Sequence, residues 1–166
     1  MIVRPASIDD APQMRVLLNE IIKAGGTTAH QTLFDNDRMI AHYVACPTGI
    51  CCHVAESHGQ VLGFQQLDGP DPDHGGEAGW GHIASFVQTF AAGSGIGQKL
   101  FAETLKQANR AGVRYINATI RADNTFGLRY YHGLGFETFD RQIGKPLTDG
   151  TPVDRVVTRY DLKPTS

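Results

Sequence analysis

A chain of 166 residues with 41% apolar and 19% charged side chains has the composition of one folded domain, which excludes a disordered protein. Its net charge of -2 and its lack of a basic run exclude an electrostatic basis for binding nucleic acid. No apolar run is long enough to span a membrane, and the first residues lack the features of a signal peptide. We therefore expect a cytoplasmic protein without a membrane partner, in which Cys46, Cys51 and Cys52 stay reduced.

Short strands and helices alternate in the first half of the chain. Ser7 and Asp10 have the spacing of a capping box, and apolar residues at helical spacing follow them as far as Gly25. His58 and Gly59 join two strand-like segments and predict a tight antiparallel hairpin. In chain order, the expected elements are a strand at 2–6, a helix at 8–24, a helix around 39–44, and strands at 49–57 and 60–68.

The second half contains a strand–helix–strand unit. A strand at 80–89 leads through a glycine-rich turn into a helix at 96–111 and a strand at 114–120. This order predicts two parallel strands joined by a right-handed crossover. Asn124 can cap a short helix that Gly135 ends, and two more strands close the chain. The sequence therefore predicts one mixed α/β domain over residues 1–166, with parallel and antiparallel pairs in one sheet.

The stretch AAGSGIGQKL, residues 91–100, places three glycines directly before a helix. Glycine-rich turns at helix N-termini present free N–H groups to anions such as phosphate. A Walker loop does not fit, because Gly97 is followed by Gln98 and Lys99 with no hydroxyl residue in the magnesium position. A dinucleotide fingerprint does not fit either, because Gln98 stands where the third glycine is required.

The segment GSGIGQKL resembles the pyrophosphate loop of the GNAT acyltransferase superfamily, which has Gln or Arg, then a Gly and a Gly or Ala at fixed spacing. Gly95 and Gly97 stand at the two small positions, whereas Ala92 replaces the usual Gln or Arg. The segment NTFGLRYYHGLGFE at 124–137 resembles the family's second element, in which an Asn, a small residue, a Tyr and Gly-Phe surround a short helix. The opening IVRPA and the late DGTPVDRVVTRYDL are similar to the phosphinothricin N-acetyltransferase branch.

The resemblance implies a GNAT-type fold, a central mixed sheet of about seven strands with flanking helices and a splayed pair of parallel strands. It implies acetyl-CoA as co-substrate, no metal, and direct transfer of the acetyl group to the amine of a small molecule, an amino acid or an analogue. Many relatives pair through their C-terminal strands, so we expect a homodimer. Two alternatives stay open: a protein or peptide N-acetyltransferase, and a non-catalytic acyl-CoA-binding sensor, which the departure at Ala92 favours.

The resemblance also assigns the contacts of the co-substrate. The amides of the glycine turn would cradle the pyrophosphate, and a backbone N–H near Val87 would stabilise the oxyanion of the tetrahedral intermediate. Tyr131 takes the place of the family tyrosine that protonates the leaving thiolate, whereas we expect Tyr130 to face the core. Asn124 would bond the pantetheine arm. The expected contacts of the co-substrate are Phe86, Val87, Gly93, Ser94, Gly95, Ile96, Gly97, Gln98, Asn124 and Tyr131.

The attacking amine must be neutral, so a base has to take its proton. His82 stands where phosphinothricin-type enzymes carry a glutamate, and an imidazole can accept a proton near neutral pH. The alternative is a histidine packed under the sheet, with a water chain acting as the base. We expect the acceptor to contact His30, in a polar loop, and Glu77, in the acidic loop at 69–79. A plain solvated loop is the alternative for 69–79.

Overall fold

The computed structural model describes residues 1–70 and 76–164 of the chain. Its helices are α1 (Ala11–Ala24), α2 (Asn36–Met39), α3 (Ile96–Arg110) and α4 (Thr125–Leu134). Its strands are β1 (Ile2–Pro5), β2 (Gly49–Ser57), β3 (Gln60–Asp68), β4 (Trp80–Val87), β5 (Tyr115–Arg121), β6 (Glu137–Pro146) and β7 (Pro152–Asp161). Single helical turns at Ile8–Asp10 and Ile40–Val44 adjoin α1 and α2. A third turn, at Thr89–Ala91, follows β4, so the strand predicted at 80–89 ends earlier than expected.

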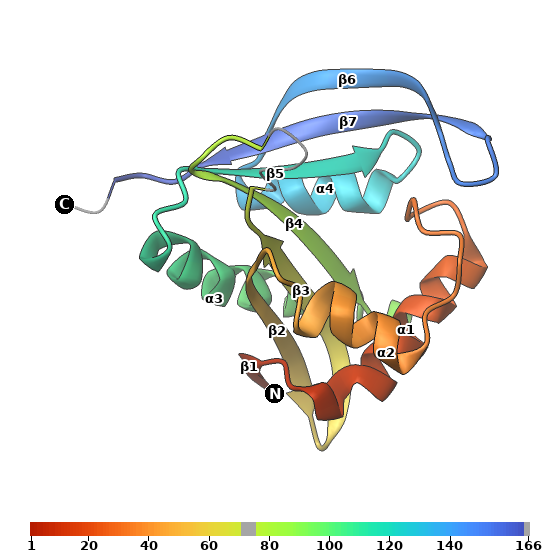
Figure 1. Ribbon diagram of the computed structural model, residues 1–166, viewed down its shortest axis with the longest axis vertical. Helices are drawn as coiled ribbons and strands as arrows, with labels where there is room; N and C mark the ends of the chain where they lie inside the picture. Colours follow the sequence, from red (N-terminus) through yellow and green to blue (C-terminus); the bar gives the residue numbers. More distant parts are fainter. Residues whose placement is uncertain (71–75, 165–166) are drawn as a thin grey trace.

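The described strands form one seven-stranded sheet in the order β1-β2-β3-β4-β5-β7-β6 (Figure 1). Neighbouring strands are antiparallel except β4 and β5, which run parallel as the strand–helix–strand unit predicts. Their pairing is short, from Trp80 opposite Tyr115 to His82 opposite Asn117. Beyond these residues β4 continues to pair with β3, and β5 with β7, while the two parallel strands separate. The expected mixed sheet with a splayed parallel pair is confirmed.

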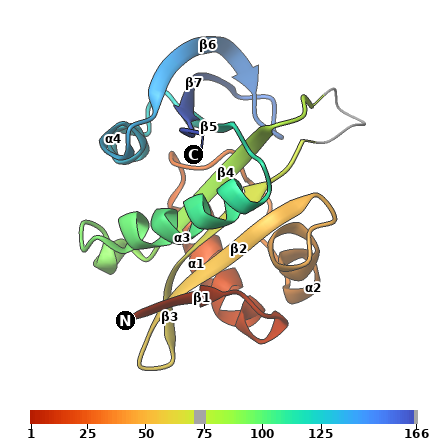
Figure 2. The ribbon, with the colours of Figure 1, turned by 90° about the vertical axis from the view of Figure 1, so that its left-hand side faces the viewer.

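Helices cover both faces of the sheet. Figures 1 and 2 show α1 and α2 on the opposite side of β2–β4 from α3. Side chains of β4 alternate between the two faces, as a period of two requires. Ala84 and Phe86 pack in the core cluster that contains α1 and α2, whereas Ile83 packs in the cluster that contains α3 and α4. The side chains of β4 beside the gap therefore point alternately toward the layer of α1 and α2 and toward the layer of α3 and α4.

The predicted helix ends are found where the sequence placed them. The Ser7 amide donates to the Asp10 carboxylate at 2.8 Å, which begins the first helical segment. Gly25 ends α1 with a φ of 72°, and Gly135 ends α4 with a φ of 106°, backbone conformations that glycine adopts without strain. The Asn124 side chain accepts from the Gly127 amide at 2.9 Å and caps α4. These caps fix α4 beside the end of β5, and with it both tyrosines of the helix.

Candidate active site

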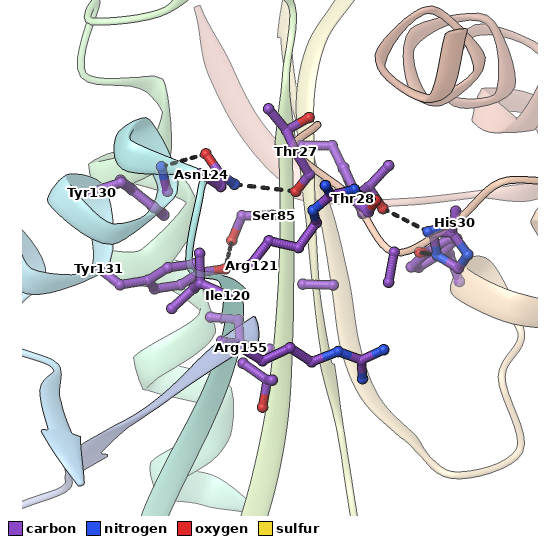
Figure 3. Close-up of a pocket in the computed structure, with 17 residues that line it drawn as sticks. Thr27, Thr28, His30, Ser85, Ile120, Arg121, Asn124, Tyr130, Tyr131 and Arg155 are labelled. Carbon is purple, nitrogen blue, oxygen red and sulfur yellow. Dashed lines mark hydrogen bonds between the residues drawn. The ribbon is translucent and has the colours of Figure 1, made fainter. Parts of the chain in front are cut away.

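A cavity of about 280 Å³ lies where β4 and β5 separate (Figure 3). Its wall is formed by β4, by the end of β5, by the loop at 27–30, by α4 and by one side chain of β7. The lining residues are Thr27, Thr28, Ala29, His30, Tyr43, Ile83, Ala84, Ser85, Phe86, Thr119, Ile120, Arg121, Asn124, Gly127, Tyr130, Tyr131 and Arg155. Segments that are far apart in the sequence meet here because the two parallel strands part.

The backbone of β4 has unpaired groups along this gap. The amide of Gln88 donates to the carbonyl of Leu62 on β3 at 2.8 Å. Because alternate residues of a strand direct their backbone groups to the same side, the amides of Val87 and Ser85 point away from β3, toward the gap. β5 has already separated at this level, so these amides have no strand partner there in the described chain. The arrangement agrees with the prediction of an oxyanion donor at Val87.

Phe86 has its place in an aromatic cluster on the side of α1 and α2. Its ring centroid lies 5.0 Å from that of Phe64 and 5.8 Å from that of Tyr43. The Tyr43 hydroxyl in turn shares a hydrogen bond of 2.8 Å with Nε2 of His30. Phe86 therefore joins the wall of the cavity to the buried core under α1, and its contact with a co-substrate stays a prediction.

Tyr131 reaches the gap from α4 and is only 7% exposed. Its hydroxyl lies 2.9 Å from the hydroxyl of Ser85 on β4 (Figure 3). Burial raises the pKa of Tyr131 well above its usual value, so the phenol is protonated at neutral pH and can act as a donor. The position suits the predicted acid, because the hydroxyl lies beside the unpaired amides of β4.

A hydrogen-bonded network connects both tyrosines, and the sequence reasoning missed its other members. Thr104 donates to Oε1 of Gln65 at 2.7 Å. The Gln65 amide group donates to Ser85 at 2.8 Å and to the Tyr130 hydroxyl at 3.0 Å. The sequence did contain a signal for them, because Gln65 and Ser85 each stand among apolar residues of a strand. Buried polar groups in such positions are normally paired by hydrogen bonds.

The two tyrosines of α4 are not divided as expected, with Tyr130 in the core and Tyr131 at the cavity. Tyr131 is the more buried of the two and belongs to the core cluster of α3 and α4, although both rings border the cavity. The Tyr130 hydroxyl donates to the carbonyl of Gly97 at 2.7 Å, and burial raises its pKa to about 12. The Tyr130 proton is thus used in a hydrogen bond to α3, so Tyr131 is the tyrosine that can give its proton to the thiolate.

The glycine turn presents a set of free amides before α3. Gly93 and Gly95 have φ values of 81° and 82°, which side chains adopt only with strain. The first helical bond runs from Lys99 to Gly95 at 3.2 Å, and no described backbone carbonyl accepts from the amides of residues 93 and 95–98. The amide of Ser94 donates to the carbonyl of Ala91, and the contact of Ser94 with the co-substrate stays a prediction.

Gly97 is small for a reason that the sequence did not reveal. A Cβ atom at this position would lie 2.5 Å from Cε2 of the Tyr130 ring. The second small residue of the turn therefore permits α4 to pack on the first turn of α3. Gly127 has a comparable role, since a Cβ there would lie 2.6 Å from Nδ2 of Asn124.

Asn124 ties the loop at 27–30 to α4. While its Oδ1 caps the helix, its Nδ2 donates to the carbonyl of Thr27 at 3.1 Å (Figure 3). Arg121 donates to the neighbouring carbonyl of Thr28 at 3.4 Å. The loop is thereby held over the cavity from the side of α1. The predicted bond of Asn124 to a pantetheine arm stays a prediction.

The predicted acceptor contacts are brought together only in part. His30 lines the cavity, and burial, followed by the charges of His42 and Arg38, lowers its pKa to about 4, so it is neutral at neutral pH. Glu77 is exposed and does not line the cavity. Residues 71–75 of the same acidic loop lie outside the described residues.

His82 is exposed at the last position of β4 that pairs with β5, and it also lies outside the cavity lining. It stands opposite Asp68 on β3 and Asn117 on β5. His82 shares a face with Ala84, the next residue but one, which does line the cavity. It is therefore not packed under a helix, and its role as base stays a prediction.

Two arginines that the sequence reasoning did not single out, Arg121 and Arg155, border the cavity. None of its described lining residues is acidic. Within residues 1–70 and 76–164 no group of three or more His, Cys, Asp or Glu side chains is placed to hold a metal ion. The three cysteines are free thiols. None of the described helices is both long and apolar enough to cross a membrane.

Solved structures with the same fold cover nearly the whole chain, whereas no curated protein sequence matches it. An N-acetyltransferase from Staphylococcus aureus Mu50 superposes with a TM-score of 0.85 at 21% identity, covering 98% of each chain. A ribosomal-protein-alanine N-acetyltransferase from Brucella melitensis has a TM-score of 0.80 at 24% identity, covering 98% of this chain and 100% of that one. A phosphinothricin acetyltransferase from Sinorhizobium meliloti, in complex with acetyl-CoA, has a TM-score of 0.82 at 19% identity, covering 99% and 93%. The model of the acetyltransferase (GNAT) family matches residues 15–136, and the chain belongs to that family.

Proposed function

We propose that the protein transfers the acetyl group of acetyl-CoA to the amine of a small molecule, an amino acid or an analogue of one. The observation that carries this proposal is the gap between β4 and β5, where unpaired β4 amides and the protonated hydroxyl of Tyr131 border a cavity. Family membership supports acetyl-CoA as the donor, and the Sinorhizobium meliloti relative is a complex with acetyl-CoA.

The glycine turn would bind the pyrophosphate of acetyl-CoA. Five amides of the turn, those of Gly93, Gly95, Ile96, Gly97 and Gln98, have no described backbone acceptor and lie at the N-terminus of α3. Each favourable contact of an anion with a helix N-terminus contributes about 0.3–1 kcal/mol. Ala92 supplies no side-chain donor where the family has Gln or Arg, so the backbone amides would provide the main part of the binding here.

The chemical step divides between β4 and α4. The amine nitrogen attacks the thioester carbonyl carbon, and the Val87 amide donates to the oxyanion that forms, a contribution of about 2.7–4 kcal/mol to the transition state. The carbon–sulfur bond then breaks, and the departing thiolate takes the proton of the Tyr131 hydroxyl. Ser85 can then donate a hydrogen bond to the phenolate oxygen of Tyr131, because its own oxygen already accepts from Gln65, and the proton that the amine gives up restores the phenol.

The acceptor side of the cavity favours a small amine over a peptide. The loop at 27–30 is held beside the cavity by bonds from Asn124 and Arg121, which narrows the space for an extended chain at this point. A peptide acceptor is nevertheless the second candidate, because the Brucella melitensis relative is named for acetylating a ribosomal protein. A sensor without activity would bind acetyl-CoA but release no thiol.

Thermal stability with acetyl-CoA and thiol release with a panel of amines test the function. At a hundredfold excess over Kd, a ligand that binds only the folded state adds about 2.7 kcal/mol, which raises Tm by about 5–10 °C for a domain of this size. NADH should give no shift. Binding without thiol release over the whole panel would favour the sensor, and turnover of peptide N-termini alone would favour the second candidate.

Gly95→Val provides the matched test of the turn. A β-branched side chain is strained at a φ of 82° and would stand where the pyrophosphate approaches, so the Tm shift with acetyl-CoA should vanish. Gly112→Val is the control, because Gly112 has a φ of 74°, open space around its Cβ and a place at the other end of α3. A folded Gly95→Val protein that keeps the full shift would rule out the turn as the cradle.

We further propose a cytoplasmic homodimer that pairs through the C-terminal strands. β6 is the edge of the sheet and is exposed along most of its length. Two large apolar side chains stand open on it, Phe139 with 49% and Ile143 with 70% of their surface exposed. Light scattering should give twice the mass of the chain, and Ile143→Lys should return it to the mass of a monomer.

A further inference from the structure

We propose that Arg155 binds an anionic group of the acceptor, a carboxylate, on the side of the cavity away from the glycine turn. The proposal rests on the function given above and names the part of the acceptor that the protein recognises. Arg155 lies on β7, borders the cavity and extends across it in Figure 3. Among the described residues, its surroundings leave this cation without a counter-charge.

Arg155 and Arg121 stand directly opposite each other on neighbouring strands. Like charges in this position repel each other unless other groups balance them. Arg121 is balanced, since its Nε and Nη2 donate to the two carboxylate oxygens of Asp123 at 3.0 and 2.9 Å. Arg155 forms no ion pair with any carboxylate in the described chain.

The Nε atom of Arg155 is buried and has no hydrogen-bond acceptor among the described residues. A buried donor on a charged group that lacks a partner is costly, and native structures normally satisfy it with protein, water or ligand. The planar guanidinium presents paired N–H groups that match a carboxylate. A ligand carboxylate in the cavity would satisfy both the orphan donor and the excess charge.

The position of Arg155 separates this anion from those of acetyl-CoA. Along β5, Ile120 packs in the cluster of α3 and α4, so Arg121 and its partner Arg155 face the other side of the sheet. The glycine turn leads into α3 and therefore lies on the side of the sheet that α3 and α4 cover. Arg155 therefore serves the acceptor half of the cavity, where no described lining residue is acidic and His30 is neutral.

A carboxylate held by Arg155 also orients the amine and helps to keep it neutral. In an α-amino acid the amine stands on the carbon next to the carboxylate, so anchoring one fixes the other within the cavity. No described lining residue is acidic, so the wall offers no counter-charge that would stabilise the protonated amine. The site thus selects the anionic form of the amino acid, in which the amine is the nucleophile.

The test compares L-amino acids with their carboxamides, which differ only in the carboxylate. We expect the wild-type protein to favour the free acids by about 10- to 100-fold in kcat/KM, the range for a hydrogen bond to a charged group. Arg155→Met should bring this ratio close to one, Arg155→Lys should restore part of it, and the KM for acetyl-CoA should stay within about twofold of wild type. Comparing ratios between variants cancels the different basicities of the two amines.

Arg159→Met is the matched control. Arg159 lies on the same face of β7 but outside the cavity lining, where its Nε pairs with Asp161 at 2.7 Å and its guanidinium stacks over Tyr115. It should keep the wild-type ratio of acids to amides. Equal use of acids and amides by the wild-type protein, or an unchanged ratio in Arg155→Met, would overturn the proposal.

A binding measurement keeps the test independent of turnover. With CoA present, the free acids should raise Tm more than their amides do in the wild-type protein but not in Arg155→Met. If no amine of the panel is acetylated, the proposed function fails, and this difference in Tm still decides whether Arg155 binds carboxylates. Arg155→Gln, which keeps a polar side chain, replaces Arg155→Met should the latter not fold, and equal Tm shifts from acids and amides would again overturn the proposal.

Discussion

The substitution Gly97→Ala should destabilise the protein, although alanine is normally the better helix former. Gly97 is the second residue of α3, and replacing glycine by alanine in a helix ordinarily stabilises by about 1 kcal/mol. Here the new Cβ would lie 2.5 Å from Cε2, 2.9 Å from Cζ and 3.0 Å from the hydroxyl oxygen of Tyr130. The ring has to move, and its 2.7 Å hydrogen bond to the Gly97 carbonyl is then lost or distorted.

The magnitude follows from these three effects. Overpacking of this kind costs about 1–3 kcal/mol, and a lost hydrogen bond costs about 0.5–1.5 kcal/mol. After the gain of about 1 kcal/mol in helix propensity, the net destabilisation is about 0.5–3.5 kcal/mol. Each kcal/mol lowers the Tm of a domain of this size by about 2–4 °C.

Denaturant unfolding of a double-mutant cycle with Tyr130→Ala provides the assay. Once the ring is removed, Gly97→Ala should stabilise the protein by up to about 1 kcal/mol, so the effect reverses its sign. Gly133→Ala, inside α4 with open space around the new Cβ, is the control and should stabilise in both backgrounds. A Gly97→Ala protein as stable as wild type, or the same loss with and without Tyr130, would refute the packing argument.

Two further predictions concern the tyrosines and a buried histidine. Tyr131→Phe should lower kcat by about 10²–10⁴-fold with little change in acetyl-CoA affinity, whereas Tyr130→Phe should mainly lower stability, because its hydroxyl is bound to Gly97; equal losses of kcat in both variants would contradict the assignment. His30 has a folded-state pKa of about 4, below its ordinary value of 6.5, so its unfolded form binds a proton that the folded form rejects. Stability should therefore fall as the pH drops from about 6.5 to about 4, and His30→Phe should reduce that slope by about one proton; an unchanged slope would contradict the burial of its neutral form.

Local signals in the sequence were sufficient for several helix ends and for the order of the elements along the chain. Gly25, Asn124 and Gly135 act within a few residues of their own position, so spacing alone predicted a helix end at each. The strand–helix–strand order also required the parallel pair of β4 and β5. That the two strands separate was predicted only from the family resemblance. Neither His82 nor Asn117, where the pairing ends, is a residue type that marks such a point.

Contacts between distant segments explain what the sequence could not predict. Gly97 was interpreted as a residue that admits phosphate, but its missing Cβ makes room for Tyr130, 33 residues later in the chain. Arg155 stands beside the cavity only because the register of β5 and β7 pairs it with Arg121. A period of two assigns residues to alternate faces, but it does not say which face borders a cavity. For that reason Ser85 was overlooked, although it adjoins the predicted residues of the same strand.

The proton of the amine is the remaining question of mechanism, and the structure narrows the candidates for the base. Burial lowers the pKa of His30 to about 4 and also lowers that of His42, so both are poor proton acceptors near neutral pH. His82 is exposed on the acceptor face of β4, two residues or about 7 Å from Ala84 in the cavity wall, a distance that a water molecule can bridge. If His82 takes the proton through water, His82→Ala should lower kcat/KM and change the acidic limb of its pH profile, which should then follow the ionisation of the amine. His82→Glu should restore part of the rate, since a carboxylate can accept the same proton. An identical pH profile in a folded His82→Ala protein would refute this role and leave a water chain as the route by which the amine loses its proton.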